Sequence, residues 1–177
     1  MRVGVARRRH RVSLETVSVS LPFGIGSMAW KVDTTQKKAA WSLYVELVTR
    51  IAVQPLEVDQ GLVREALNSL YSLFGTTREV LKAAGLNVGA ARDSVGGIAL
   101  AQPAAGIAVL NNGLRPFLAK WHPLLQAWEG RRPVGVSPKE HEQSWSEEPK
   151  LRSELEALRG GLEDYAKALA VIAGVED

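Results

Sequence analysis

Apolar residues recur with a seven-residue spacing along four stretches of the chain, and this pattern limits the folds open to it. Alternating steps of three and four residues place side chains on one face of an α-helix. The four stripes are Ala40, Tyr44, Leu47 and Ile51; Val63, Leu67, Leu70, Phe74, Thr77, Leu81 and Ala84; Leu114, Leu118, Trp121, Leu125 and Trp128; and Leu151, Leu155, Leu158, Leu162, Tyr165, Leu169 and Ile172. They predict a mainly α fold, an antiparallel four-helix bundle with the stripes packed together.

Local signals predict where the first two helices begin and end. Asp33 followed by Gln36 is a capping-box pattern, so the first helix should begin at Thr34 and stop at Gln54, before Pro55. Its second apolar side (Trp41, Val45 and Val48) predicts burial on more than one face. The second helix should span residues 60–84, with Asp59 as cap and Gly85 as stop. Within it, Gly75-Thr76 predicts a kink or a break.

The second half of the chain should hold the remaining helices. A third helical region follows Asp93 and Ser94, and its prolines predict that it is kinked or broken. These prolines are Pro103, Pro116 and Pro123, and Asn111-Asn112-Gly113 is another weak point for a helix. Ser137-Pro138-Lys139-Glu140 predicts one short helical turn. The last helix should cover residues 147–173, where Gly160-Gly161 would let another backbone approach closely.

The N-terminal part has the pattern of strands. Residues 12–32 alternate apolar and polar side chains on both sides of the turn residues 22–27, which predicts a β-hairpin with one apolar face and a bulge near Thr16. We therefore expect a basic disordered tail over 1–11 and a single domain over 12–177. The domain would consist of the hairpin (12–32) and the helical bundle (34–177).

The charge of the chain is concentrated at its N-terminus. The 177 residues contain no cysteine and carry a formal net charge of +3. Residues 1–11 hold five arginines and no acid, so the remaining 17 basic and 19 acidic residues leave a body of about −2. Such a tail is either solvated or grips phosphate, through Arg7, Arg8, Arg9 and Arg11. The longest apolar run, residues 95–110, is shorter than the roughly twenty residues of a membrane span. We expect a soluble, cytoplasmic protein that does not enter a membrane.

The sharpest local pattern is Leu114-Arg-Pro-Phe-Leu-Ala-Lys-Trp-His122, in which six residues separate Arg115 from His122. This pair resembles the signature of the HEPN ribonucleases, which are small helical bundles with a closely spaced Arg and His. The resemblance implies metal-independent RNA cleavage by a dimer, with Arg115 binding or polarising phosphate and His122 as acid or base. The alternative, which we favour, is that both are solvated polar positions beside the Leu/Trp stripe.

Other candidate motifs are weaker. Gly24-x-Gly26-x-x-Ala29 is a turn within the hairpin, because no helix or second parallel strand accompanies it. The Glu-x-x-His pairing typical of di-iron bundles is absent around His10, His122 and His141. We therefore identify no metal ligands and no cofactor.

These observations favour a non-enzymatic function. We expect a protein–protein interaction or scaffold subunit of a larger bacterial assembly, which associates with a protein partner or with itself through the hairpin edge or a helix face. Trp30 and Trp145 are the candidate partner contacts. The alternative is a nucleic-acid-associated helical bundle, bound through the arginine tail or acting as an HEPN-like ribonuclease with Arg115 and His122.

Overall fold

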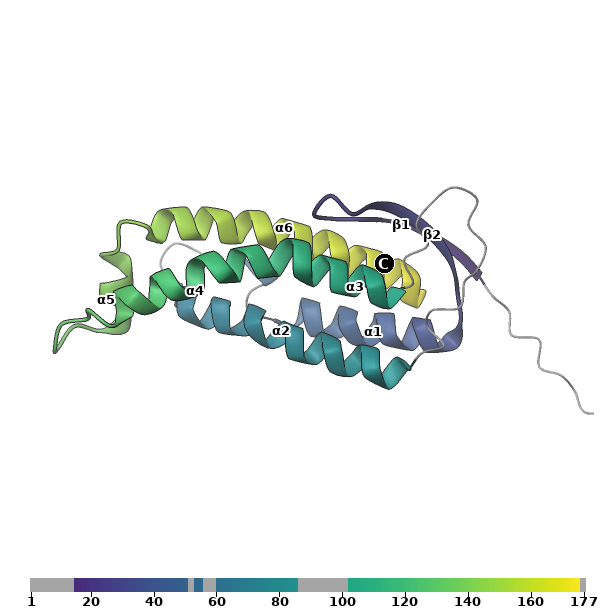
Figure 1. The fold of residues 1–177 in the computed structure, drawn as a ribbon, viewed down its shortest axis with the longest axis horizontal. Helices are drawn as coiled ribbons and strands as arrows, with labels where there is room; N and C mark the ends of the chain where they lie inside the picture. Colours follow the sequence, from purple (N-terminus) through teal and green to yellow (C-terminus); the bar gives the residue numbers. More distant parts are fainter. Residues whose placement is uncertain (1–14, 51–52, 56–59, 86–101, 176–177) are drawn as a thin grey trace, which may run out of the picture.

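The chain folds into long helices preceded by a two-stranded hairpin (Figure 1). The computed structural model describes residues 15–50, 53–55, 60–85 and 102–175. Its elements are β1 (Glu15–Leu21), β2 (Gly26–Val32), α1 (Thr34–Val48), α2 (Val63–Ala84), α3 (Gln102–Val109), the π-helical segment η3 (Leu110–Leu114), α4 (Arg115–Glu129), α5 (Pro138–Gln143) and α6 (Glu148–Ala173). The predicted basic tail and the caps Asp59, Asp93 and Ser94 lie outside the described residues. The predicted bulge near Thr16 is wrong for the described part of β1, because Glu15–Leu21 pair with β2 one residue against one, with Thr16 opposite Lys31.

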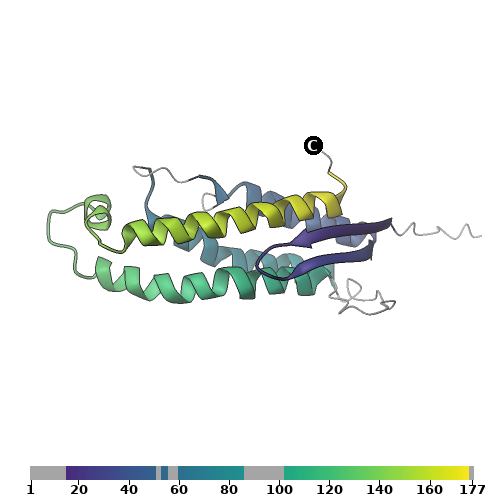
Figure 2. The same cartoon turned by 90° about the horizontal axis from the view of Figure 1, so that it is seen from above.

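The helices lie alongside one another in an elongated bundle. Helix α1 packs against α6 and α2, α2 also contacts α4, and α4 also contacts α6. The hairpin lies along the surface of this bundle with β1 against α6 (Figure 2), and α5 lies near the opposite end of the molecule (Figure 1). The helical bundle and the N-terminal hairpin expected from the sequence are therefore confirmed.

The predicted apolar stripes form most of the core. Every stripe residue of α6 is buried, as are Leu114, Leu118, Trp121 and Leu125 of the third stripe. In α2 the buried stripe consists of Val63, Leu67, Leu70 and Thr77. Since such packing removes apolar surface from water along each helix, the stripes stabilise the bundle as a whole.

Helix α1 differs from its prediction in length and in burial. Its capping box is present, with Asp33 Oδ1 accepting from Gln36 N–H, but the helix ends at Val48 and not at Gln54. The chain forms a tighter 3₁₀-type turn there, because Arg50 N–H donates to the Leu47 carbonyl three residues earlier. Trp41 (47% exposed) and Val45 lie on the surface, so the predicted burial on a second face is wrong. Only one side of α1 packs on α6 and α2, through residues such as Leu43 and Leu47.

Helix α2 begins later than predicted and has no break. It starts at Val63, whose buried N–H donates to Glu142 Oε1 over 2.9 Å, so a carboxylate of α5 replaces a local cap. The helix continues through Gly75 to Ala84, and Gly85 ends it with φ +73° as expected. An added methyl group at Gly75 would meet no atom within 4 Å, so this glycine serves no close approach.

The third helical region is irregular at the weak point Asn111-Asn112-Gly113 and not at Pro123. Helix α4 contains Pro123 without a break, and the π-helical segment η3 interrupts the α-helical pattern at Asn111-Asn112-Gly113. Whether the axis bends at a proline stays a prediction. The short helix α5 has the predicted capping box of Ser137 and Glu140, and α6 covers the predicted last helix to within one residue.

The hairpin is attached to the bundle through its turn. Val17, Val19 and Leu21 of β1 are buried, as the alternation predicts. Phe23, at the turn, has φ +59° and places its ring against Gly113 of η3 and Gly161 of α6. A methyl group at either glycine would lie within 2.6 Å of the ring. The glycine at 161 therefore accommodates a side chain from the hairpin, where we had expected a backbone.

Candidate functional site

Helices α2 and α4 face each other in three regularly spaced levels. At the first, the Arg64 guanidinium donates to Glu129 through Nε (2.8 Å) and Nη2 (2.6 Å). Seven residues on in α2 and seven back in α4, the Tyr71 and His122 rings meet edge to face with centroids 5.7 Å apart. A further seven-residue step leads to Arg78 in α2 and Arg115 in α4, which line the same groove. Seven residues rise about 10.5 Å along a helix, so the levels lie two turns apart.

The environment of His122 determines which of its ring nitrogens carries the proton. Arg64 Nη1 lies 3.0 Å from His122 Nδ1, and because a guanidinium only donates, Nδ1 must accept. The neutral ring therefore carries its proton on Nε2, an atom shielded from solvent that has no hydrogen-bond partner among the described residues. Burial lowers the pKa of His122, and the charge of Arg64 lowers it further, against an opposing effect of Glu129. The imidazole is thus neutral at pH 7.

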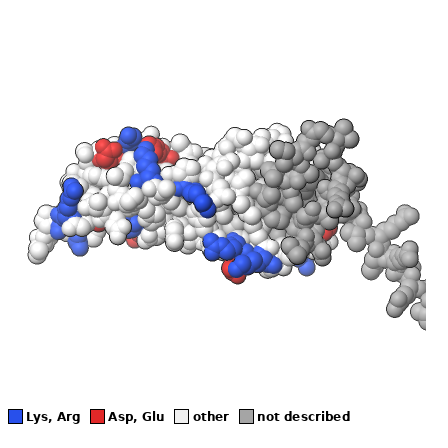
Figure 3. Space-filling model, in the orientation of Figure 1, with Lys and Arg blue, Asp and Glu red and all other residues white. Residues whose placement is uncertain are grey.

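The second and third levels line an open groove, which we call the α2/α4 groove. Its volume is about 850 Å³, within the range of small-molecule sites. The lining contains no acidic side chain. Its residues are Asn68, Tyr71, Ser72, Phe74, Gly75 and Arg78 of α2 with Arg115, Leu118, Ala119, His122, Pro123 and Gln126 of α4. Figure 3 views the face on which α2 and α4 lie in front, and its acidic atoms lie mainly near the edges.

The structure brings two predicted site residues together. Arg115 and His122 lie two turns apart on α4, and both line the α2/α4 groove. Sequence reasoning missed Tyr71 and Arg78, although they repeat the same seven-residue spacing on α2. The seven-residue spacing of Tyr71 and Arg78 is visible in the sequence, but it points to this groove only once α2 and α4 are known to be neighbours.

The remaining predicted site residues have other positions. Trp145 is buried (7% exposed) between Trp121, which it meets edge to face, and Trp128, on which it stacks. It belongs to the core, in contrast to our expectation from its polar surroundings. Trp30 pairs with Val17 in the hairpin register, and its side chain lies outside the described part of the structure. The arginines Arg7, Arg8, Arg9 and Arg11 also lie outside it.

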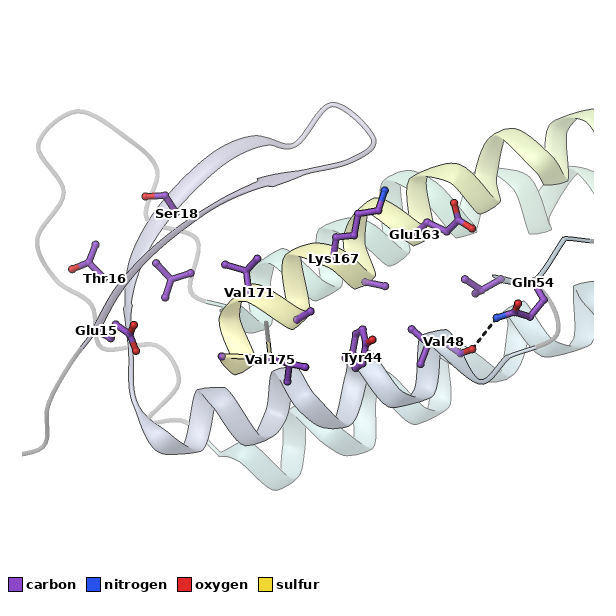
Figure 4. Close-up of a pocket in the computed structure, with 15 residues that line it drawn as sticks. Glu15, Thr16, Ser18, Tyr44, Val48, Gln54, Glu163, Lys167, Val171 and Val175 are labelled. Carbon is purple, nitrogen blue, oxygen red and sulfur yellow. Dashed lines mark hydrogen bonds between the residues drawn. The ribbon is translucent and has the colours of Figure 1, made fainter. Parts of the chain in front are cut away.

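A second groove, the β1 groove, runs between β1 and the C-terminal halves of α1 and α6. Its volume is about 860 Å³. Figure 4 shows its lining, with Thr16 and Ser18 from β1, Tyr44 and Val48 from α1, and Val171 from α6. Within the described ranges β1 pairs only with β2, so its other edge has no backbone partner. This groove therefore combines an open strand edge with apolar helix surface.

The chain matches no protein-family model, and comparison with curated proteins and with solved structures found no match either. Within the described residues, no three His, Asp or Glu side chains gather as a metal site would require. Across the same residues, every helix is too short or too polar to cross a membrane.

Proposed function

We propose that the chain is a non-enzymatic protein-interaction module, a subunit of a larger assembly, and that the β1 groove receives its partner. One observation carries this proposal, namely that the unpaired edge of β1 borders a groove with apolar side chains. Backbone groups at such an edge accept an additional strand, and adjacent pockets select its side chains. Val171, 53% exposed, offers apolar surface at this groove without a partner in the described structure.

The occupant we propose is an extended segment of a partner protein with apolar residues at alternate positions. Side chains of neighbouring strands alternate between the same two faces of a sheet. A strand added beside β1 would therefore place its apolar residues on the face of Val17 and Val19. That face lies towards the helices, so these residues would cover Val48 and Val171.

Affinity purification of the full chain tests this function. Val171→Arg places a charge in the β1 groove, and we expect it to abolish association that the matched variant Val134→Arg retains, because Val134 is fully exposed and lies outside the groove. Association is measured by light scattering and by the recovery of co-purifying protein. A strictly monomeric wild-type chain with no co-purifying partner, or equal recovery with both variants, would overturn the proposal.

A second candidate function is nucleic-acid association, including RNA cleavage by Arg115 and His122. The observation that favours it is the shared groove of these two residues. However, His122 Nδ1 already accepts a hydrogen bond from Arg64, and His122 Nε2 is shielded from solvent. Proton transfer would therefore require His122 or the adjacent Tyr71 to move. Cleavage of single-stranded RNA that disappears in His122→Ala would support this candidate, and a wild-type chain without cleavage activity would discard it.

The arrangement of the helices as a four-helix bundle is also part of our proposal. We infer that α1, α2, α3–α4 and α6 act as one antiparallel four-helix bundle, which the cycle of packing contacts and the opposed levels of α2 and α4 support. The kinked third helix, the single domain over 12–177 and the cytoplasmic location stay predictions.

A further inference from the structure

The third level of the α2/α4 groove contains two positively charged side chains, one from each helix. Arg78 and Arg115 are exposed, and neither forms an ion pair or hydrogen bond with another described residue. At the first level, by contrast, Glu129 compensates Arg64. Like charges on neighbouring positions repel, and no acidic side chain lines this groove. An anion between the two guanidinium groups would relieve the repulsion.

The two arginines suit a phosphate group in particular. A guanidinium group presents paired donors in a plane, which match the oxygens of phosphate. Side chains on a helix lean towards its N-terminus, so Arg78 leans along the groove towards Tyr71, whereas Arg115, on the opposed helix α4, leans away from His122. The distance to the Tyr71 ring is therefore shorter for the Arg78 guanidinium than for the Arg78 backbone.

The second level adds an aromatic surface. Tyr71 is 66% exposed, although the neighbouring groove residues Phe74 and Leu118 are half-buried and buried. Its ring meets His122 only edge to face, which leaves ring surface open to a ligand. Exposed aromatic rings beside cationic side chains are typical stacking surfaces for nucleobases. The amides of Asn68 and Gln126 also line the groove and offer donors and acceptors for a base edge.

We propose that the α2/α4 groove binds a nucleotide, free or as a unit of single-stranded RNA, with its base on Tyr71 and its phosphate between Arg78 and Arg115. This site is separate from the β1 groove, so it goes beyond the proposed interaction function, and it specifies a ligand for the groove that the second candidate function also uses. It requires no cleavage and no proton transfer by His122. The groove volume of about 850 Å³ accommodates a nucleotide and leaves both ends open to a continuing strand.

Binding measurements with the full chain test this proposal. The probes are adenosine diphosphate and a short fluorescent oligoadenylate, with polyglutamate as an acidic polymer that lacks bases. We expect Tyr71→Ala and the double variant Arg78→Gln, Arg115→Gln to weaken binding of the nucleotide probe about tenfold or more. Trp41→Ala, an exposed aromatic on α1, and Arg131→Gln, an exposed arginine beyond α4, are the matched controls and should bind as the wild type does.

The arms of the experiment separate the possible ligands. Binding of adenosine diphosphate alone identifies a free nucleotide, whereas tighter binding of oligoadenylate identifies RNA. Equal affinity for polyglutamate would overturn the proposal, as would groove variants that bind normally. A full-length variant with Arg7, Arg8, Arg9 and Arg11 changed to Gln must retain binding, because loss in this variant alone would assign the ligand to the tail. Circular dichroism spectra identical to the wild type exclude unfolding as the cause of any loss.

Discussion

One side chain of the hairpin turn packs against two glycines of the helices. The Phe23 ring occupies the space where Gly113 and Gly161 lack a side chain. Gly161 lies within α6, where glycine costs up to about 1 kcal/mol relative to alanine in a free helix. Gly161 therefore weakens α6 locally, but it leaves the space in which Phe23 attaches the hairpin to the helices.

Gly161→Ala should lower the free energy of unfolding by about 1–3 kcal/mol, because the new methyl group would lie 2.5 Å from the Phe23 ring. The neighbouring Gly160→Ala is the matched control. Its methyl group meets no atom within 4 Å, so we expect a gain of up to about 1 kcal/mol. Urea unfolding measures both changes. In a Phe23→Ala background the cost of Gly161→Ala should disappear, and a cost that persists would contradict this account of the contact.

His122 offers a second residue-scale prediction. Its pKa, measured from the imidazole proton shifts by NMR, should lie below the ordinary 6.5 because of burial and the charge of Arg64. Since the folded pKa is lowered, His122 contributes stability above about pH 6.5, and this contribution is lost as the pH falls through the folded value. Arg64→Gln should raise the pKa, whereas Arg131→Gln should leave it unchanged. A pKa that is insensitive to Arg64 would show that the 3.0 Å contact is not maintained in solution.

At the scale of elements, the short helix α5 caps α2 from a distant part of the sequence. Glu142 is buried (5% exposed), and its carboxylate accepts from Val63 N–H while Arg152 Nη2 lies 3.7 Å away. A carboxylate at a helix N-terminus satisfies a free donor and interacts favourably with the helix dipole. The connection between α4 and α6 therefore contributes directly to the stability of α2.

Glu142→Ala should destabilise the fold by about 1–3 kcal/mol, because it leaves a buried backbone donor without its acceptor. Glu147→Ala is the control, since Glu147 is exposed and its side chain makes no capping hydrogen bond. Hydrogen exchange should also speed up in the first turn of α2 in the Glu142 variant alone. Equal unfolding midpoints for the two variants would contradict the capping role.

The sequence predicted those features that depend on neighbours along the chain. The stripe of α6, the capping boxes at Asp33 and Ser137, and the alternation of β1 are local signals, and the structure has them. The start of α2 could not be predicted, because its cap is Glu142, 79 residues away. For the same reason Arg78 and Tyr71 escaped notice, since only the packing of α2 on α4 brings them beside Arg115 and His122.

At the scale of the whole molecule, the two grooves lie over different helix pairs. The β1 groove is lined by α1 and α6, whereas the other groove is lined by α2 and α4. Their lining residues do not overlap, so substitutions in one groove should act independently of those in the other. Val171→Arg should therefore leave nucleotide binding unchanged, and the Arg78, Arg115 double variant should retain the protein partner. If either variant abolished both activities, the two grooves would not be separate sites.

Hydrogen exchange of β1 in the free chain and in its purified assembly tests the central claim most directly. Strand addition would bond those β1 backbone amides that point away from β2, so alternate amides between Glu15 and Leu21 should exchange much more slowly in the assembly. The amides of α2, which take no part in this contact, should exchange at the same rate in both states. An assembly that forms while the β1 amides exchange as fast as in the free chain would contradict the claim.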